Sequence, residues 1–75
     1  MHIPTLTPAQ LRILEQVIAG QRDFVGRGLA RTASALQRLG LITVEERWAV
    51  YRRKFRYGIR PALPIEELRQ VVEGQ

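Results

Sequence analysis

The spacing of the apolar residues changes at Gly40, and this change constrains the fold more than any other feature of the sequence. Before Gly40, apolar residues such as Leu11, Leu14 and Val17 recur at the three- and four-residue intervals of a helix. After it, apolar and polar residues alternate with a period of two, which is the pattern of a half-buried strand. At 75 residues, the chain has room for one domain. We therefore expect residues 1–75 to form a single small α+β domain.

Two helices are predicted before Gly40. The first covers 8–19, since Thr7 is a suitable N-cap, Gln10 completes a capping box and Gly20 supplies the stop. The second covers 28–39 and ends at Gly40, where the following apolar pair favours a Schellman motif. The face of the second helix expected to be buried consists of Leu29, Ala33, Leu36 and Leu39.

Two further segments complete the folded part of the domain, which we place at about 6–73. They are the connection between these helices and the last part of the chain. Residues 21–26 have room for one short turn of helix at most, and Phe24 and Val25 are apolar enough to enter the core. After two proline residues that break the chain, an apolar stripe over 65–73 predicts a third helix, with acidic residues in its first turn.

A β-hairpin is predicted between Leu41 and Arg60. The tip is expected at or near 52–54, with 45–47 as the other candidate turn, and neither contains the Gly or Asn that a tight hairpin prefers. Trp48 and Phe55 are expected in the core, although aromatic residues interleaved with arginines could also stack on bases. Tyr51 and Tyr57 could lie on the exposed face of the sheet.

The basic residues are concentrated in the middle of the chain. Twelve basic residues, eleven of them Arg, stand against seven acidic ones, for a net charge of +5. Segment 24–44 has three arginines and no acid, and 45–60 has six basic residues against two acidic ones, so 24–60 carries +7. The two ends together carry −2. A basic centre of this kind favours one face made for a polyanion.

Two groups of residues are candidates for that face. At 100° per residue, Arg27, Arg31, Ser34 and Arg38 fall within about 60° of one another on the second helix. A merely solvated face usually mixes acids with bases, and no acid interrupts this one. The other group is at the hairpin tip, and it consists of Arg52, Arg53, Lys54 and Arg56. Charges at a tip also protect an edge strand from aggregation, but one or two would be enough for that.

The order of the predicted elements resembles a winged helix-turn-helix DNA-binding domain. The resemblance is carried by the run LQRLGLIT over 36–43 and by LTPAQLRIL over 6–14, and it covers about residues 6–60. It implies a winged-helix-like arrangement of helix, helix, β-hairpin and helix. The sequence departs from the family in one respect, because only seven residues separate Gly20 from Gly28, where a full domain has another helix.

The resemblance also implies how such a domain would meet duplex DNA. Helix 28–39 would be the recognition helix in the major groove, and the wing over 44–60 would lie on the backbone or in the minor groove. The residues implied on the helix are Arg27, Arg31, Ser34, Gln37 and Arg38, and those on the wing are Arg52, Arg53, Lys54 and Arg56.

The sequence lacks the residues from which most catalytic sites and metal sites are built. There is no cysteine, and the one histidine is His2, so we expect no catalytic residues, no metal site and no cofactor. The side chains of the adjacent acids Glu45–Glu46 and Glu66–Glu67 would point in different directions on a strand or a helix. No cysteine or histidine accompanies them as a catalytic partner. No apolar run approaches 18 residues and no signal peptide is recognisable, which favours a cytoplasmic protein without a membrane span.

Three functions remain open from the sequence. The first is a transcription regulator, of a size typical of bacterial or phage proteins, that binds double-stranded DNA and forms a homodimer to read two half-sites. The second is a protein-interaction module, an adaptor or inhibitor that binds the transcription machinery, for example RNA polymerase. The third is a sequence-neutral binder of RNA or single strands that uses the aromatic residues of the wing.

Overall fold

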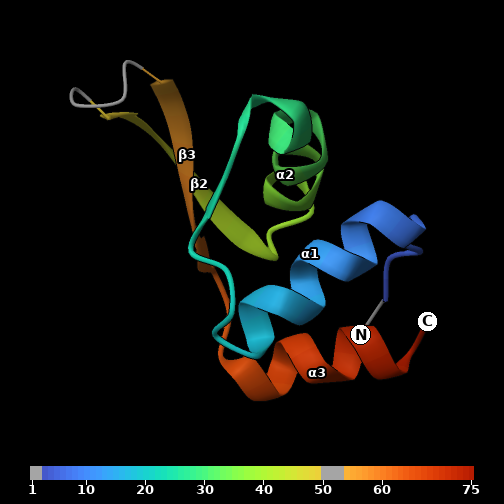
Figure 1. The fold of residues 1–75 in the computed structure, drawn as a ribbon. Coiled ribbons are helices and arrows are strands. Elements are labelled where there is room, and N and C mark those ends of the chain that lie inside the picture. Colours follow the sequence, from blue (N-terminus) through green and yellow to red (C-terminus); the bar gives the residue numbers. More distant parts are fainter. Residues whose placement is uncertain (1–2, 50–53) are drawn as a thin grey trace.

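The computed structural model shows a small α+β domain with three α-helices and a three-stranded antiparallel sheet (Figure 1). It describes residues 3–49 and 54–75, the side chains of 46–49 and 54–56 excepted. In chain order the elements are α1 (Pro8–Ile18), β1 (Phe24–Val25), the 3-10 turn η1 (Arg27–Leu29), α2 (Ala30–Arg38), β2 (Ile42–Ala49), β3 (Lys54–Pro61) and α3 (Ile65–Glu73). The predicted order of helix, helix, hairpin and helix is confirmed.

Both ends of α1 form as the sequence predicts. The backbone N–H of Gln10 donates to Thr7 Oγ1 at 3.2 Å, and the backbone N–H of Thr7 donates to Gln10 Oε1 at 3.0 Å. These two bonds are the capping box, which satisfies N–H groups that the helix itself leaves without partners. At the other end, Ala19 is the C-cap and Gly20 has a φ of 70°, so the helix stops one residue earlier than 8–19.

A Schellman motif at Gly40 joins α2 to β2. The N–H of Gly40 donates to the Gln37 carbonyl at 2.9 Å, and the N–H of Leu41 donates to the Leu36 carbonyl at 3.1 Å. Gly40 has a φ of 77°, a conformation that glycine reaches without the steric cost of a Cβ atom. The chain reverses there, and Leu41 and Ile42 enter the core directly after the turn.

The predicted helix over 28–39 is corrected at both ends. Its first residues form the 3-10 turn, and regular α-helix covers only Ala30–Arg38. Leu39, predicted to be buried, is 44% exposed. It occupies the C-cap, where the backbone already turns into the Schellman motif, so its side chain does not follow Ala33 and Leu36 into the core.

Segment 21–26 contains a short strand, not a turn of helix. Phe24 lies opposite Gly58 and Val25 opposite Tyr57, and the N–H of Ile59 donates to the Asp23 carbonyl at 2.8 Å. Because successive strand residues point to opposite faces, Val25 is fully buried while Phe24 is 43% exposed. The expectation that both side chains enter the core is therefore wrong for Phe24.

The hairpin is confirmed, and its register is now defined. β2 and β3 pair from Ile42 opposite Pro61 to Ala49 opposite Lys54. Glu45 lies opposite Gly58 within this ladder, so the alternative turn over 45–47 is wrong. Strand β3 lies in the middle of the sheet, in the order β1-β3-β2. The predicted tip residues Arg52 and Arg53 lie outside the described residues, as does Tyr51.

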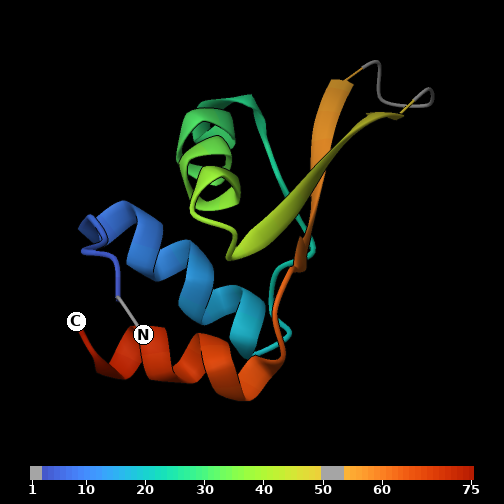
Figure 2. The same cartoon turned by 180° about the vertical axis from the view of Figure 1, so that it is seen from behind.

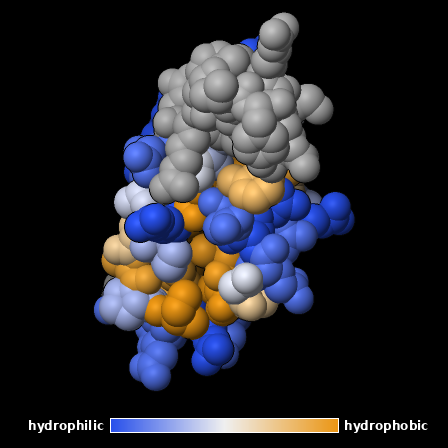
Figure 3. Space-filling view, turned by 60° about the vertical axis from the view of Figure 1, so that its left-hand side comes forward, coloured by the Kyte–Doolittle hydropathy of each residue, from blue (hydrophilic) through white to orange (hydrophobic). Residues whose placement is uncertain are grey.

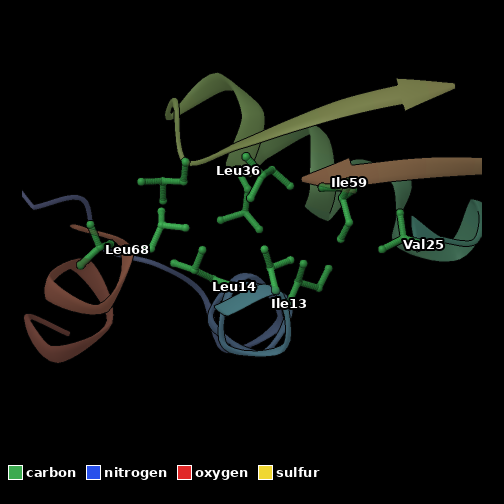
Figure 4. Close-up of a cluster of buried hydrophobic side chains, with 11 residues drawn as sticks. Ile13, Leu14, Val25, Leu36, Ile59 and Leu68 are labelled. Atoms are coloured by element: carbon green, nitrogen blue, oxygen red, sulfur yellow. The ribbon is translucent and has the colours of Figure 1, made fainter. Parts of the chain in front are cut away.

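The core is formed mainly where α1 meets the other elements. α1 lies between α2 and α3 and also contacts β3 (Figures 1 and 2). Figure 4 shows Ile13 and Leu14 of α1 pointing toward Leu36 and Ile59, with Leu68 of α3 at one end and Val25 at the other. The buried residues are Ile13, Leu14, Val17, Val25, Ala33, Leu36, Leu41, Ile42, Ile59, Leu68 and Val71. The third helix covers 65–73 as predicted. The side chains of Trp48 and Phe55, which were predicted in the core, lie outside the described part of the structure.

Leu36 of α2 and Leu39 at the C-cap of this helix provide a matched test of this packing. Leu36→Ala should lower the free energy of unfolding by about 2–5 kcal/mol, because it opens a cavity at a fully buried position. Leu39→Ala removes the same atoms from an exposed C-cap and should cost under about 0.5 kcal/mol. Urea denaturation followed by circular dichroism measures both; equal losses would contradict the placement of Leu39.

Candidate nucleic-acid interface

The side of α2 that faces away from the core carries the candidate residues. Ala33 and Leu36 bury the inner side of the helix against the rest of the domain. The five residues predicted on the outer side are Arg27, Arg31, Ser34, Gln37 and Arg38, and all of them are exposed. The structure thus leaves the whole helical part of the candidate site accessible to a partner.

Arg27 does not share the α-helical geometry of the other four. It is the first residue of the turn η1, and a 3-10 helix has 3.0 residues per turn. The angular positions estimated at 100° per residue therefore do not apply to Arg27. Arg31, Ser34 and Arg38 lie on regular α-helix, where the rotation of 100° per residue applies. Arg27 is therefore a neighbour of this cluster at the N-terminal end of α2, and not a member of the same stripe.

A groove runs along this part of α2 and reaches strand β3. It has a volume of about 480 Å³, and its lining residues are Ala30, Arg31, Ser34, Ala35, Arg38 and Tyr57. Three predicted site residues, Arg31, Ser34 and Arg38, are thus brought together in one concavity. Tyr57, which comes from β3, was not among the predicted site residues. Its place in an alternating aromatic and arginine pattern is the signal that could have pointed to it.

The cations of the groove have no acidic partner in the described part of the chain. No carboxylate there forms an ion pair with Arg31 or Arg38, and none of the lining residues with described side chains is acidic. Arg22 shows the contrasting, structural use of an arginine: its Nε donates to Gln16 Oε1 at 2.5 Å, and its Nη1 donates to the Phe24 carbonyl at 3.4 Å. The guanidinium groups in the groove are consequently available to an external anion.

The N-terminal end of α2 is arranged poorly for the stability of the helix itself. Leu29 at the N-cap makes no side-chain capping bond, and no acidic residue lies in the first turn. Arg31 lies there instead, near the positive end of the helix dipole, which disfavours cations. By contrast, α1 has a capping box and α3 has Glu66 and Glu67 in its first turn. An unfavourable charge in this place indicates a role for Arg31 other than stabilising the fold.

The wing contributes its candidate residues from the distal end of the hairpin. Lys54 and Arg56 lie at the start of β3, opposite Ala49 and Arg47 of β2. The hairpin begins near the C-terminal end of α2, close to α1, and runs alongside α2 (Figures 1 and 2). Arg52 and Arg53 lie outside the described residues, so their contact with DNA stays a prediction.

The described residues show neither a metal-binding cluster nor a helix that could span a membrane. Over 3–49 and 54–75, no group of three or more His, Asp or Glu residues is placed to hold a metal ion. In the same part of the chain, no helix has both the length and the apolar character needed to cross a membrane.

The cost of Arg31 to the helix can be measured directly. Arg31→Glu should raise the free energy of unfolding by about 0.3–1 kcal/mol at low ionic strength, because an acid replaces a cation near the positive end of the dipole. The gain should shrink in high salt. Gln37→Glu, in the last turn, serves as the matched control and should give no gain. Thermal and urea denaturation at two salt concentrations provide the values, and a loss of stability in Arg31→Glu would refute the argument.

Relationships to other proteins add no constraint on this site. Comparisons with family models, with curated proteins and with solved structures each gave no match to this chain. The function must accordingly be argued from the α2 face, the groove and the charge of the chain.

Proposed function

We propose that this protein binds double-stranded DNA and acts as a transcription regulator by occupying it. In this proposal α2, with η1, approaches the major groove, and the wing over 44–60 lies on the phosphate backbone. The observation that carries the proposal is the outer side of α2, which is exposed, basic and without an acidic partner in the described part of the chain. The charge of +7 carried by 24–60, which includes the hairpin, also supports the proposal.

The shape of the helix supports a close approach to DNA. The major groove is about 12 Å wide and admits an α-helix. Ala30, Ser34 and Ala35 are small residues between the arginines, so the backbone of α2 can come near a partner. Arginine pairs with guanine and glutamine with adenine, which makes Gln37 and the arginines suitable for contacts with bases.

The proposal includes membership of the winged helix-turn-helix family in a reduced form. The order of the elements supports it, and so does the turn at Gly40, where a recognition helix would stop and the wing begin. The helix that a full domain has after the first one is replaced by β1 and η1. A surface of this size rarely suffices alone for a specific site, so we infer a cytoplasmic homodimer, without catalysis or cofactor.

One observation favours the second candidate function, a protein-interaction module. Phe24 is 43% exposed on β1, a strand at the edge of the sheet. Figure 3 shows apolar side chains gathered on the side of the molecule along which this segment runs, bordered by hydrophilic ones. An exposed apolar patch of this kind is a feature of protein interfaces. An adaptor or inhibitor that binds an acidic surface of RNA polymerase would use the basic residues as well.

A salt-dependent titration with mixed-sequence duplex DNA tests the proposal. The wild-type protein should bind near 50 mM salt, and log K should fall linearly with log salt because bound phosphates release counterions. Arg31→Ala and Arg53→Ala should each weaken binding by roughly 5-fold or more, which is about 1 kcal/mol. Arg12→Ala removes the same charge from an exposed position on α1 and should change affinity less than 2-fold.

The possible results separate the candidate functions. If the wild type shows no affinity for duplex DNA near 50 mM salt, the proposal fails, and the protein-interaction module becomes the better candidate. Equal affinity for single strands would instead favour the sequence-neutral binder. If Arg12→Ala weakens binding as much as Arg31→Ala, DNA binding stands but its assignment to the α2 face does not.

A further inference from the structure

We propose that the groove between α2 and β3 binds a phosphodiester segment of one nucleic-acid strand, with Tyr57 as a contact residue. Arg27 and Gln37, which are exposed but lie outside the groove, would then be left to face the bases. This inference rests on the proposed DNA binding and divides its surface into a part that positions the DNA and a part that specifies sequence.

The chemistry of the lining selects an anion with several acceptor oxygens. Arg31 and Arg38 bring guanidinium groups, and Ser34 and Tyr57 bring hydroxyl groups that can donate. The remaining lining residues with described side chains, Ala30 and Ala35, are small and apolar, and none of the described lining residues is acidic. A guanidinium fork matches the geometry of phosphate oxygens and forms charge-assisted hydrogen bonds with them.

The shape of the groove separates backbone from bases. In B-DNA, base edges form the floor of a groove about 8.5 Å deep, so only a projecting protein element reaches them. The sugar-phosphate backbone, by contrast, projects from the duplex as a ridge, and a concave protein surface can fit over it. Arg31, Ser34 and Arg38 line a concavity, and its volume of about 480 Å³ exceeds that of a single phosphate group. A stretch of backbone is therefore the occupant that fits both its shape and its charge.

Tyr57 is well placed to fix the position of such a strand. Its backbone lies in the central strand β3, between Val25 of β1 and Glu46 of β2. Its side chain is half-buried and packs against the hydrophobic core, while part of it lines the groove. A side chain held in this way loses little conformational freedom on binding, so its hydroxyl can act as a positioned donor.

Variants inside and outside the groove test the assignment with a pool of randomised duplexes. Tyr57→Phe keeps the ring and loses the hydroxyl, so affinity should fall roughly 2- to 10-fold. Arg38→Ala should weaken binding to all sequences alike and reduce the salt slope by about 0.9, the value for one lost phosphate contact. Sequencing of the bound fraction should show an unchanged preference for both. Gln37→Ala should alter the preference at one position and leave the slope unchanged.

A charge-matched control and a fold check accompany these variants. Arg69→Ala removes one exposed arginine from α3, which does not line the groove, and it should leave slope and preference as in the wild type. Thermal melts should show that Tyr57→Phe is folded at the temperature of the assay. An unchanged affinity and slope in both Tyr57→Phe and Arg38→Ala would overturn the assignment while DNA binding by the wild type still stood. A changed sequence preference in Arg38→Ala would also overturn it, because that residue would then read bases.

A second measurement does not depend on duplex binding. In amide NMR spectra, an abasic phosphodiester oligomer carries backbone without bases, and it should shift the signals of Ser34, Ala35 and Tyr57. The signal of Arg69 should not move. A poly-glutamate peptide of equal charge is the comparison, and larger shifts with the peptide would overturn the assignment in favour of an acidic protein partner.

Discussion

The hydrogen bond from the Leu41 amide to the Leu36 carbonyl, at 3.1 Å, sets the relation between α2 and the hairpin. It closes the Schellman motif that the left-handed Gly40 permits, and Leu36, Leu41 and Ile42 are all buried around it. The end of β3 is joined to the same place, since the N–H of Ala62 donates to the Leu41 carbonyl at 3.1 Å. The groove has one wall on α2 and the other on β3, so its existence depends on this turn.

Stability and the proposed function are divided between different parts of the domain. The capping box of α1, the acidic first turn of α3 and the apolar cluster around Leu14 all strengthen the fold. The α2 end has no cap and carries Arg31 where a cation is disfavoured. Because its N-terminal end is uncapped, α2 is held in position by the packing of Ala33 and Leu36. Its outer face is not needed for stability and can carry basic residues. The same division supports a binding role for that face and not a structural one.

How much was predictable depends on the distance over which each feature is determined. The capping box, the stop at Gly40 and the third helix over 65–73 each arise within a few residues, and the sequence predicts all of them. The strand β1 is only two residues long and exists because it pairs with β3, more than thirty positions away in the chain. No local pattern announces such a strand, so the exposure of Phe24 was missed. Leu39 was misplaced for a related reason, since helical periodicity takes no account of the turn that ends the helix.

The sequence by itself determined the three helices, the hairpin, the turn at Gly40 and the concentration of positive charge at 24–60, because periodicity, capping and charge are local properties of the chain. It also placed Arg31, Ser34 and Arg38 on one helical face. Only the tertiary structure decided that these residues share a groove with Tyr57, because β3 reaches α2 through packing and strand pairing. It likewise decided which apolar residues stay exposed. Concavity is a property of two elements together, and the pattern of either one alone does not contain it.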